Sequence, residues 1–326
     1  GWMVGGNFPW TADRAVSLRI ADERARGFQG GALAMARAGN VRELKAALNT
    51  YQHTAGTNTI AADKFGEVLY GDLGPVVGFT DRQLAECRIG GPLFRGDTSA
   101  CEWGTDADSA APGLLGASKQ AHLFRTDYVT NSNDSFWLAN PEAPLTDVPA
   151  VQGPTGTERR MRTRSGLMMV RARQQGSDGL PGNKFDMTTL AETMLSNRNT
   201  AAQLLLDDLV TLCRREPSIA LEGEQVSLEG ACEVLAAWDR YNNIESRGAH
   251  LFREFLRTAR TDTDDKGSVP GSLKLKHPFD PSRPIETPAG LDIADNPAAL
   301  ASLAEAVRTL EDAGIKLDAR LGDIQG

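Results

Sequence analysis

The chain has 326 residues, of which 40% are hydrophobic and 24% charged, which is ordinary globular composition and enough length for one large domain or two smaller ones. Its net charge of −8 repels phosphate backbones and anionic lipid heads, so we expect neither nucleic acid nor a membrane as a partner. No apolar run approaches the roughly 20 residues needed to cross a bilayer, and residues 1–7 lack the features of a signal peptide, so any export signal is expected outside this chain.

The first elements are expected to be helical. An amphipathic stretch begins after Thr11, and a second helix is predicted after Asn40. The Asn40 side chain can cap that helix while Glu43 reaches back toward the cap, which is the capping-box arrangement.

The residue pattern then changes to one typical of strands and loops. Residues 58–64 and 67–72 are predicted to form a β-hairpin that turns at Phe65-Gly66, because β-branched and aromatic residues flank a glycine there. Residues 74–160 contain many Gly, Pro, Asp and Ser residues and show no helical periodicity. They are predicted to form strands and long ordered loops, where functional residues commonly lie.

A helical period returns in the second half of the chain. Four segments carry apolar residues at i, i+3 and i+4 and are predicted to form a bundle: 186–196, 200–215, 227–238 and 248–260. Residues 262–297 are polar and rich in proline, so we expect them to run extended over the surface. A last helix is predicted over 297–313, with Gly314 in the C′ position.

The four cysteines have no C-x-x-C spacing, which argues against a zinc ribbon or a thioredoxin-type pair. Cys213 and Cys232 lie at facing ends of two predicted helices around a short connection, so a disulfide is expected there, with Cys87 and Cys101 as a second pair. The alternative is four buried thiols.

Common catalytic motifs are absent: the sequence has no G-x-S-x-G, S-x-x-K, H-E-x-x-H, Walker loop or G-x-G-x-x-G. The four histidines are scattered along the chain, so their spacing supports neither a metal site nor a Ser–His pair.

The most unusual segment covers residues 127–141, where amide and hydroxyl side chains cluster directly before Phe136-Trp137. Neutral hydrogen-bond donors beside aromatic residues are typical of a pocket that stabilises an oxyanion. The alternative is an Asx-turn cluster in which Asn131, Asn133 and Asp134 bond their own backbone, and composition alone favours this alternative.

At this segment the chain resembles the penicillin acylase family, in the branch with acyl-homoserine-lactone and aculeacin acylases. Residues 130–141 read TNSNDSFWLANP and are similar to the family's T-N-x-N-D-S-x-W-L-x-N-P stretch. Weaker likenesses span most of the chain: Asn58–Asp63 with Gly71–Gly74, Ser99–Asp106, Glu158-Arg159, Trp238-Asp239, Ala313–Ile315, Leu317–Ala319 and Gly322-Asp323.

The resemblance implies an N-terminal-nucleophile hydrolase. In that family, self-cleavage exposes a serine that attacks an amide carbonyl while its own α-amino group acts as the base. By resemblance Asn133 matches the oxyanion-hole asparagine, and Arg159 matches an arginine that helps to position that end of the site. Asn131, Phe136 and Trp137 would line the substrate pocket. For Arg159, a surface salt bridge with a nearby carboxylate is the alternative.

The chain departs from the family at the nucleophile. Family nucleophiles occur as Gly-Ser-Asn, and no Gly-Ser pair here precedes asparagine. The chain is therefore expected to be an interior piece of the large subunit, inactive alone. A small subunit from the same precursor, together with the start of the large subunit, would supply the nucleophile and the second oxyanion donor. No cofactor is expected, although some family members bind a structural calcium, for which only Asp147 is a weak match.

The fold implied is α+β, part of a four-layer αββα sandwich with a helical lobe. Residues 1–165 would form part of the catalytic core, 166–260 the helical lobe and 261–326 a truncated return segment with the last helix. The expected activity of the intact protein is hydrolysis of linear acyl amides, such as acyl-homoserine lactones, lipopeptides or β-lactams, in the periplasm or outside the cell.

Two rival interpretations remain. One is a catalytically inactive relative that uses the surroundings of Trp103, Phe136 and Trp137 to bind a ligand or partner. The other is an unrelated α+β hydrolase that uses His122 with Ser118 or Asp127, and no motif supports it.

Overall fold

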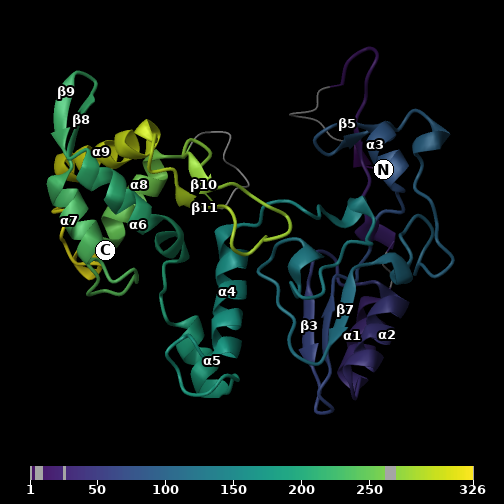
Figure 1. Cartoon of the computed structure of the whole chain (residues 1–326). Coiled ribbons are helices and arrows are strands. Elements are labelled where there is room, and N and C mark those ends of the chain that lie inside the picture. Colours follow the sequence, from purple (N-terminus) through teal and green to yellow (C-terminus); the bar gives the residue numbers. More distant parts are fainter. Residues whose placement is uncertain (1, 4–9, 25–26, 261–268, 326) are drawn as a thin grey trace. The chain divides into compact units, whose positions relative to one another are not determined.

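A computed structural model describes residues 2–3, 10–24, 27–260 and 269–325 of the chain. The chain forms two compact units, Gly1–Gly156 and Thr157–Gly326 (Figure 1). The first combines short antiparallel strands with helices and long loops, and the second is mainly helical. The predicted α+β class is confirmed, and the four-layer arrangement stays a prediction.

The first unit is organised by a three-stranded antiparallel sheet with the strand order β3-β4-β7. Its strands are β3 (Thr59–Ala62), β4 (Val68–Gly71) and β7 (His122–Arg125). On the central strand, Leu69 and Tyr70 are fully buried. Because these two residues are adjacent, their side chains lie on opposite faces of the sheet, so the central strand is buried on both faces.

The predicted hairpin between β3 and β4 is confirmed. The Asp63 side chain accepts hydrogen bonds from the backbone N–H groups of Phe65 (2.9 Å) and Glu67 (3.2 Å). Gly66 has a φ of +91°, a backbone conformation that glycine adopts without strain. The turn is therefore held by one carboxylate and permitted by one glycine.

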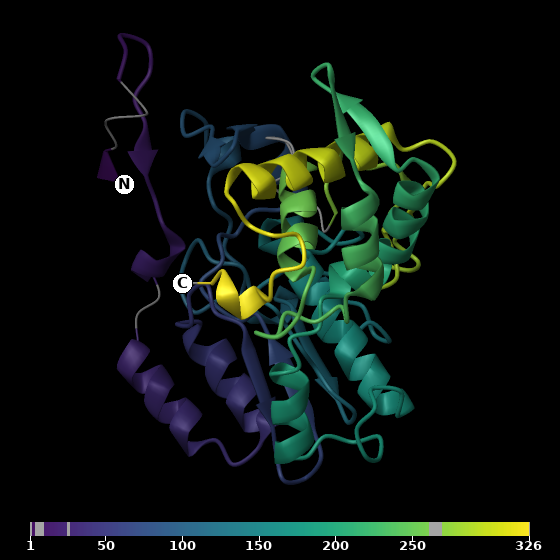
Figure 2. The same cartoon turned by 90° about the vertical axis from the view of Figure 1, so that its left-hand side faces the viewer.

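Two helices of the first unit, α1 (Phe28–Arg37) and α2 (Val41–Tyr51), lie side by side in both views (Figures 1 and 2). The predicted cap of α2 is confirmed, because Asn40 Oδ1 accepts from the backbone N–H groups of Arg42 and Glu43. The Glu43 carboxylate reaches back to the N–H of Gly39, one residue before the expected partner.

The helix predicted to begin after Thr11 is wrong in its position. Residues 10–20 contain no helix, a 3-10 turn covers Ala21–Arg24, and α1 begins only at Phe28. Almost every side chain from 10 to 20 is exposed. An amphipathic pattern forms a stable helix in a protein chiefly when its apolar face is packed, and this stretch has no such packing.

Residues 74–160 are mainly ordered loops, as predicted, but they contain the helix α3 (Asp81–Cys87). Thr80 and Gln83 form a complete capping box at its start. Seven residues are too few to show a helical period, which is why the helix was not predicted. The remaining strands of the unit are short pairs: β1 (Trp2–Met3) with β2 (Ser17–Leu18), and β5 (Arg88–Gly90) with β6 (Leu93–Phe94).

The second unit contains the helices that the apolar period predicted. They are α5 (Met187–Met194), α6 (Thr200–Arg215), α7 (Glu229–Ala237), α8 (Ala249–Thr258) and α9 (Pro297–Asp312). Figure 2 shows α9, in yellow, lying across α8. Their shared core includes Leu205, Leu209, Phe252, Phe255 and Leu303, all fully buried. Gly314 has a φ of +69° just after the cap of α9, as predicted.

Two elements of this unit were not predicted. One is the hairpin β8 (Ser218–Leu221) with β9 (Glu224–Ser227), between α6 and α7. The other is α4 (Met161–Gln175), which buries the side chains of Arg164 and Arg173 on opposite sides of the helix. Because arginines occupy core positions of α4, its apolar residues do not trace a helical stripe.

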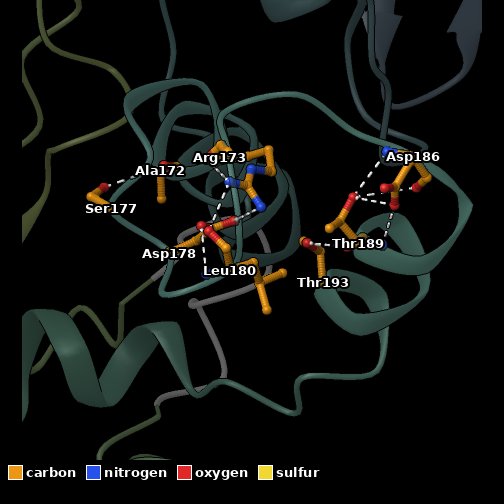
Figure 3. A network of polar contacts seen from close by, with 9 residues as sticks. Ala172, Arg173, Ser177, Asp178, Leu180, Asp186, Thr189 and Thr193 are labelled. Atoms are coloured by element: carbon orange, nitrogen blue, oxygen red, sulfur yellow. Dashed lines mark hydrogen bonds and ion pairs between the residues drawn. The ribbon is translucent and has the colours of Figure 1, made fainter.

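The buried Arg173 fastens the loop that follows α4 (Figure 3). Its guanidinium forms an ion pair with Asp178 at 3.2 Å and donates hydrogen bonds to the carbonyls of Leu180 (3.1 Å) and Gly182. Beside it, Asp186 caps α5 through the backbone N–H of Thr189 at 2.7 Å. The connection between the two helices is therefore specified by polar contacts.

Where it is described, the proline-rich connection is extended only in part, because hydrogen-bonded turns interrupt it, as between Asp280 and Thr287. Within it β10 (Leu275–His277) pairs with β11 (Ala289–Leu291), while the predicted residues 262–268 lie outside the described part. The expectation that it runs over the surface is wrong in part, because several of its side chains are buried, among them the apolar Val269, Leu273, Ile285 and Leu291. These isolated apolar residues are too widely spaced to show a period.

Both predicted disulfides are confirmed: Cys87 with Cys101 in the first unit and Cys213 with Cys232 in the second. Their Cα–Cα distances are 5.7 and 5.8 Å, which suits a disulfide. The alternative of four buried thiols is wrong. No helix among the described residues is both long and apolar enough to span a bilayer.

Candidate active site

The base of the unusual 127–141 segment is closed by polar contacts. Arg125 forms a two-pronged ion pair with Asp127, at 2.8 and 2.6 Å. The fully buried Asn140 donates to the carbonyl of Tyr128 at 2.9 Å, and the N–H of Thr130 bonds the carbonyl of Ala139 at 2.8 Å. The segment leaves and re-enters the core at one place, which makes the residues between a defined loop.

The tip of this loop is an Asx turn built on Asn131. Its Oδ1 accepts from the backbone N–H groups of Asn133 (2.7 Å) and Asp134 (3.3 Å), and its Nδ2 donates to the carbonyl of Asp134 (3.0 Å). These bonds hold Asn133 at a φ of +56°, in the left-handed region, with its side chain exposed. The Asx-turn interpretation is therefore confirmed for Asn131, and Asn133 is an exposed residue of the same turn.

A second set of polar contacts connects the turn to the sheet. The hydroxyl of Tyr70, on β4, donates to Asn58 Oδ1 at 2.6 Å and accepts from Asn131 Nδ2 at 3.5 Å. Burial is the larger of two effects that raise the pKa of Tyr70, and the nearby charge of Asp72 is the smaller. The phenol is therefore neutral at every physiological pH.

The two aromatic residues expected in the pocket lie inside the first unit. Phe136 packs with Tyr70, Ala121 and Ala139 in a small core, and Trp137 is also buried. They belong to a 3-10 turn that Ser135 caps by accepting from the N–H of Trp137 at 3.2 Å. In this chain the aromatic pair anchors the asparagine loop, and its role in binding a substrate stays a prediction.

Charge near the loop is concentrated at its base. The side-chain hydrogen bond from Arg125 is the main reason that the pKa of Asp127 falls to about 2. Burial raises the pKa of Asp72. The tip carries the neutral amides of Asn131 and Asn133, which suit stabilisation of a developing negative charge, next to the carboxylate of Asp134, whose Oδ1 accepts from the backbone N–H of Ser135 at 2.8 Å.

Arg159 belongs to the second unit, near its start. The side chain is buried, and its Nε donates to the carbonyl of Thr157 at 3.0 Å, while another nitrogen of the guanidinium donates to the Thr157 hydroxyl. It is thus not a surface residue, and its positioning role stays a prediction.

The rival hydrolase based on His122 lacks the contacts it would need. His122 Nδ1 donates to the carbonyl of Gln120 at 2.9 Å, and burial lowers the pKa of the imidazole. Asp127 is bound to Arg125, and the backbone N–H of Ser118 donates to Asp108 at 2.7 Å. In the described part of the chain, His122 forms no hydrogen bond with Ser118 or Asp127.

The described residues contain no group of three or more His, Cys, Asp or Glu side chains that could hold a metal ion. Asp147, the one residue matched to a calcium ligand, is exposed.

Sequence reasoning did not assign a role in the site to Tyr70 or Asn58. In the sequence, Asn58 belongs to a strand motif and Tyr70 to a predicted strand, and neither pattern indicates a role in the site. The available signal was alternation: a tyrosine on a central strand needs a polar partner when it is buried. The partners come from segments 12 and 61 residues away along the chain, which the sequence alone does not bring together.

Comparisons with known proteins agree over the whole chain. A family model described as penicillin amidase matches residues 3–326. Aculeacin-A acylase of Actinoplanes utahensis is 40% identical over 318 residues, which cover 93% of this chain and 38% of that protein. The acyl-homoserine lactone acylase PvdQ of Pseudomonas savastanoi pv. phaseolicola is 30% identical over 330 residues, 98% of this chain and 40% of that protein. The chain thus spans about two fifths of the length of these relatives.

Proposed function

Because this chain belongs to the penicillin amidase family, we propose that the whole protein hydrolyses amide bonds in linear acyl amides, with this chain supplying the oxyanion-binding side of the site. The observation that carries the proposal is the asparagine turn. Asn131 holds Asn133, an exposed residue with a neutral carboxamide, in a left-handed conformation. A preorganised amide donor of this kind stabilises the anion formed when a nucleophile attacks a carbonyl.

The nucleophile would come from another part of the precursor. The chain has no Gly-Ser-Asn sequence, so we expect the serine, its α-amino base and the second oxyanion donor in residues outside it, including a small subunit. Arg159 would position the same end of the site, with Asn131, Phe136 and Trp137 near the acyl group. The sheet and helices would then be part of an αββα sandwich.

The substrate class follows from the relatives by analogy. Their names specify an aculeacin and acyl-homoserine lactones, and both suit an enzyme that removes an acyl chain from a polar amine. The two disulfides support a periplasmic or secreted protein, because disulfides persist in oxidising compartments. We propose no cofactor.

The test is to express the complete precursor, measure self-cleavage by mass spectrometry and assay amide release. The substrates would be acyl-homoserine lactones of graded chain length, a lipopeptide and a β-lactam. Asn133→Ala should lower kcat/KM about a hundredfold or more. Ser132→Ala, one residue away, is the matched control and should retain activity.

Each result separates the interpretations. Cleavage with activity that depends on Asn133 supports the hydrolase. Activity that survives Asn133→Ala would remove Asn133 from the oxyanion site. A precursor without Gly-Ser-Asn, without cleavage and without activity would favour the inactive binding relative.

A further inference from the structure

The hydrogen-bonded side chains of Asn131, Tyr70 and Asn58 support an inference that rests on the proposed function and extends it. Tyr70 is fully buried on the central strand of the sheet, and its hydroxyl is the point where the sheet meets the asparagine loop. The three side chains come from three separate segments of the first unit.

The orientation of the Asn131 carboxamide is fixed by what faces it. Two backbone N–H groups, from Asn133 and Asp134, point at one end and require the oxygen there. The nitrogen then donates to the carbonyl of Asp134 at 3.0 Å, and its second, longer contact is to the hydroxyl oxygen of Tyr70 at 3.5 Å. A flipped carboxamide would place a nitrogen donor against two N–H donors and break the turn.

The phenol oxygen of Tyr70 can accept from Asn131 only if its own proton does not point at Asn131. The proton is donated to Asn58 Oδ1 at 2.6 Å, which leaves the phenol oxygen to accept from Asn131. Burial keeps the phenol protonated by raising its pKa. Donors therefore run in one direction, from Asn131 to Tyr70 to Asn58.

We propose that Tyr70, with its proton held by Asn58, is a positioning residue for the oxyanion site: it fixes the Asn131 carboxamide in the orientation that holds Asn133 in its left-handed conformation. Tyr70 does not touch the substrate. Its effect on the reaction passes through Asn131 to the Asn133 donor, which must lie within hydrogen-bond distance of the developing oxyanion.

The experiment uses the complete, processed protein and removes one oxygen atom. Tyr70→Phe keeps the ring in the core and deletes the hydroxyl. Tyr51→Phe is the matched control, because Tyr51 lies on α2 of the same unit and packs edge-on against His53. We expect Tyr70→Phe to lower kcat about tenfold with KM nearly unchanged, since misplacing a donor costs transition-state stabilisation. Tyr51→Phe should match the wild type.

A double variant tests whether Tyr70 acts through Asn133. In the Asn133→Ala background, Tyr70→Phe should lower kcat by less than about twofold, because residues acting as one unit are not additive. Asn58→Ala removes the acceptor of the phenol proton and should reproduce the effect of Tyr70→Phe. It therefore tests the same role if Tyr70→Phe folds poorly. Melting temperatures of all variants are measured alongside.

The outcomes distinguish the two proposals. If Asn133→Ala abolishes activity but Tyr70→Phe behaves like Tyr51→Phe, the positioning role is overturned and the proposed function stands. Equal losses from Tyr70→Phe with and without Asn133 would also overturn it, because Tyr70 would then act independently. If Asn133→Ala leaves activity unchanged, the oxyanion assignment fails first and the positioning role fails with it.

Discussion

Asn133 combines a chemical requirement with a conformational one. Its φ of +56° is disfavoured for most residues, and asparagine is among the few that tolerate it. The Asn131 side chain stabilises this conformation by binding the N–H of Asn133. A glycine would fit the backbone equally well, but it would present no amide group.

Replacing Asn133 by glycine and by alanine should separate these two requirements. We expect both variants of the complete protein to lose amide hydrolysis to the same extent. Asn133→Ala should also be less stable than Asn133→Gly by about 1 kcal/mol, because alanine has a Cβ that is strained in the left-handed region. Thermal unfolding of the pair measures the difference, and equal stabilities would show that the turn relaxes.

The two sequence interpretations of this loop were presented as alternatives, and the structure joins them. Composition predicted an Asx turn, and the turn is present at Asn131. The resemblance predicted that Asn133 is a donor to an oxyanion, and the turn leaves its side chain exposed. Local sequence could predict the turn because its bonds span two or three residues. It could not predict Tyr70, whose bond to Asn131 spans 61 residues.

Asp127 should make stability depend on pH. Its pKa is about 2 in the folded chain, mainly through Arg125, and it is lowered from 3.8, so this carboxylate stabilises the fold above pH 3.8. That contribution should be lost as the pH falls from 3.8 toward 2. Asp127→Asn should therefore be less stable than the wild type at pH 7, and the difference should shrink toward pH 2. A constant difference in melting temperature across this range would contradict the assignment.

At the scale of elements, prediction succeeded where an apolar stripe defines the buried face. α6 and α9 bury leucines at helical spacing and were found almost to the residue. α4 was not predicted, because two of its fully buried side chains are arginines, Arg164 and Arg173. The hairpin between α6 and α7 was not predicted either, although its strands are as long as those of the predicted hairpin β3–β4.

Arg173 should be critical for the stability of the second unit. Arg173→Met removes the partner of Asp178, a buried carboxylate, and leaves two loop carbonyls without their donor. Breaking a buried ion pair from one side costs about 3–5 kcal/mol. Denaturant unfolding should show this loss, and adding Asp178→Asn should recover part of it. Arg240→Met, which breaks a more exposed ion pair with Asp207, is the control and should cost about 1 kcal/mol or less.

At the scale of the whole molecule, each unit has its own disulfide, and all four cysteines are used. The bridges close loops with sequence separations of 14 and 19 residues. Neither bridge links one unit to the other. Each bridge therefore restricts the unfolded state of a single unit.

Reduction should destabilise both units. Loops of this size predict a contribution of about 3 kcal/mol for each bridge. This chain should show no reactive thiol when it is unfolded without a reductant, and its Cys213→Ala/Cys232→Ala variant should unfold at a lower temperature than the wild type. Thiol titration in denaturant is the direct check, and two or four reactive thiols would exclude one or both bridges.

The strand order β3-β4-β7 has a consequence for how this chain behaves by itself. Within the described residues, β3 and β7 each pair with β4 alone, so each has a row of backbone donors and acceptors on its outer side. Ile60, on β3, is half exposed. Open edges of this kind template the addition of further strands. Separated from the rest of the protein, the chain should assemble into oligomers at micromolar concentration, and a lysine in place of Ile60 should keep it dispersed.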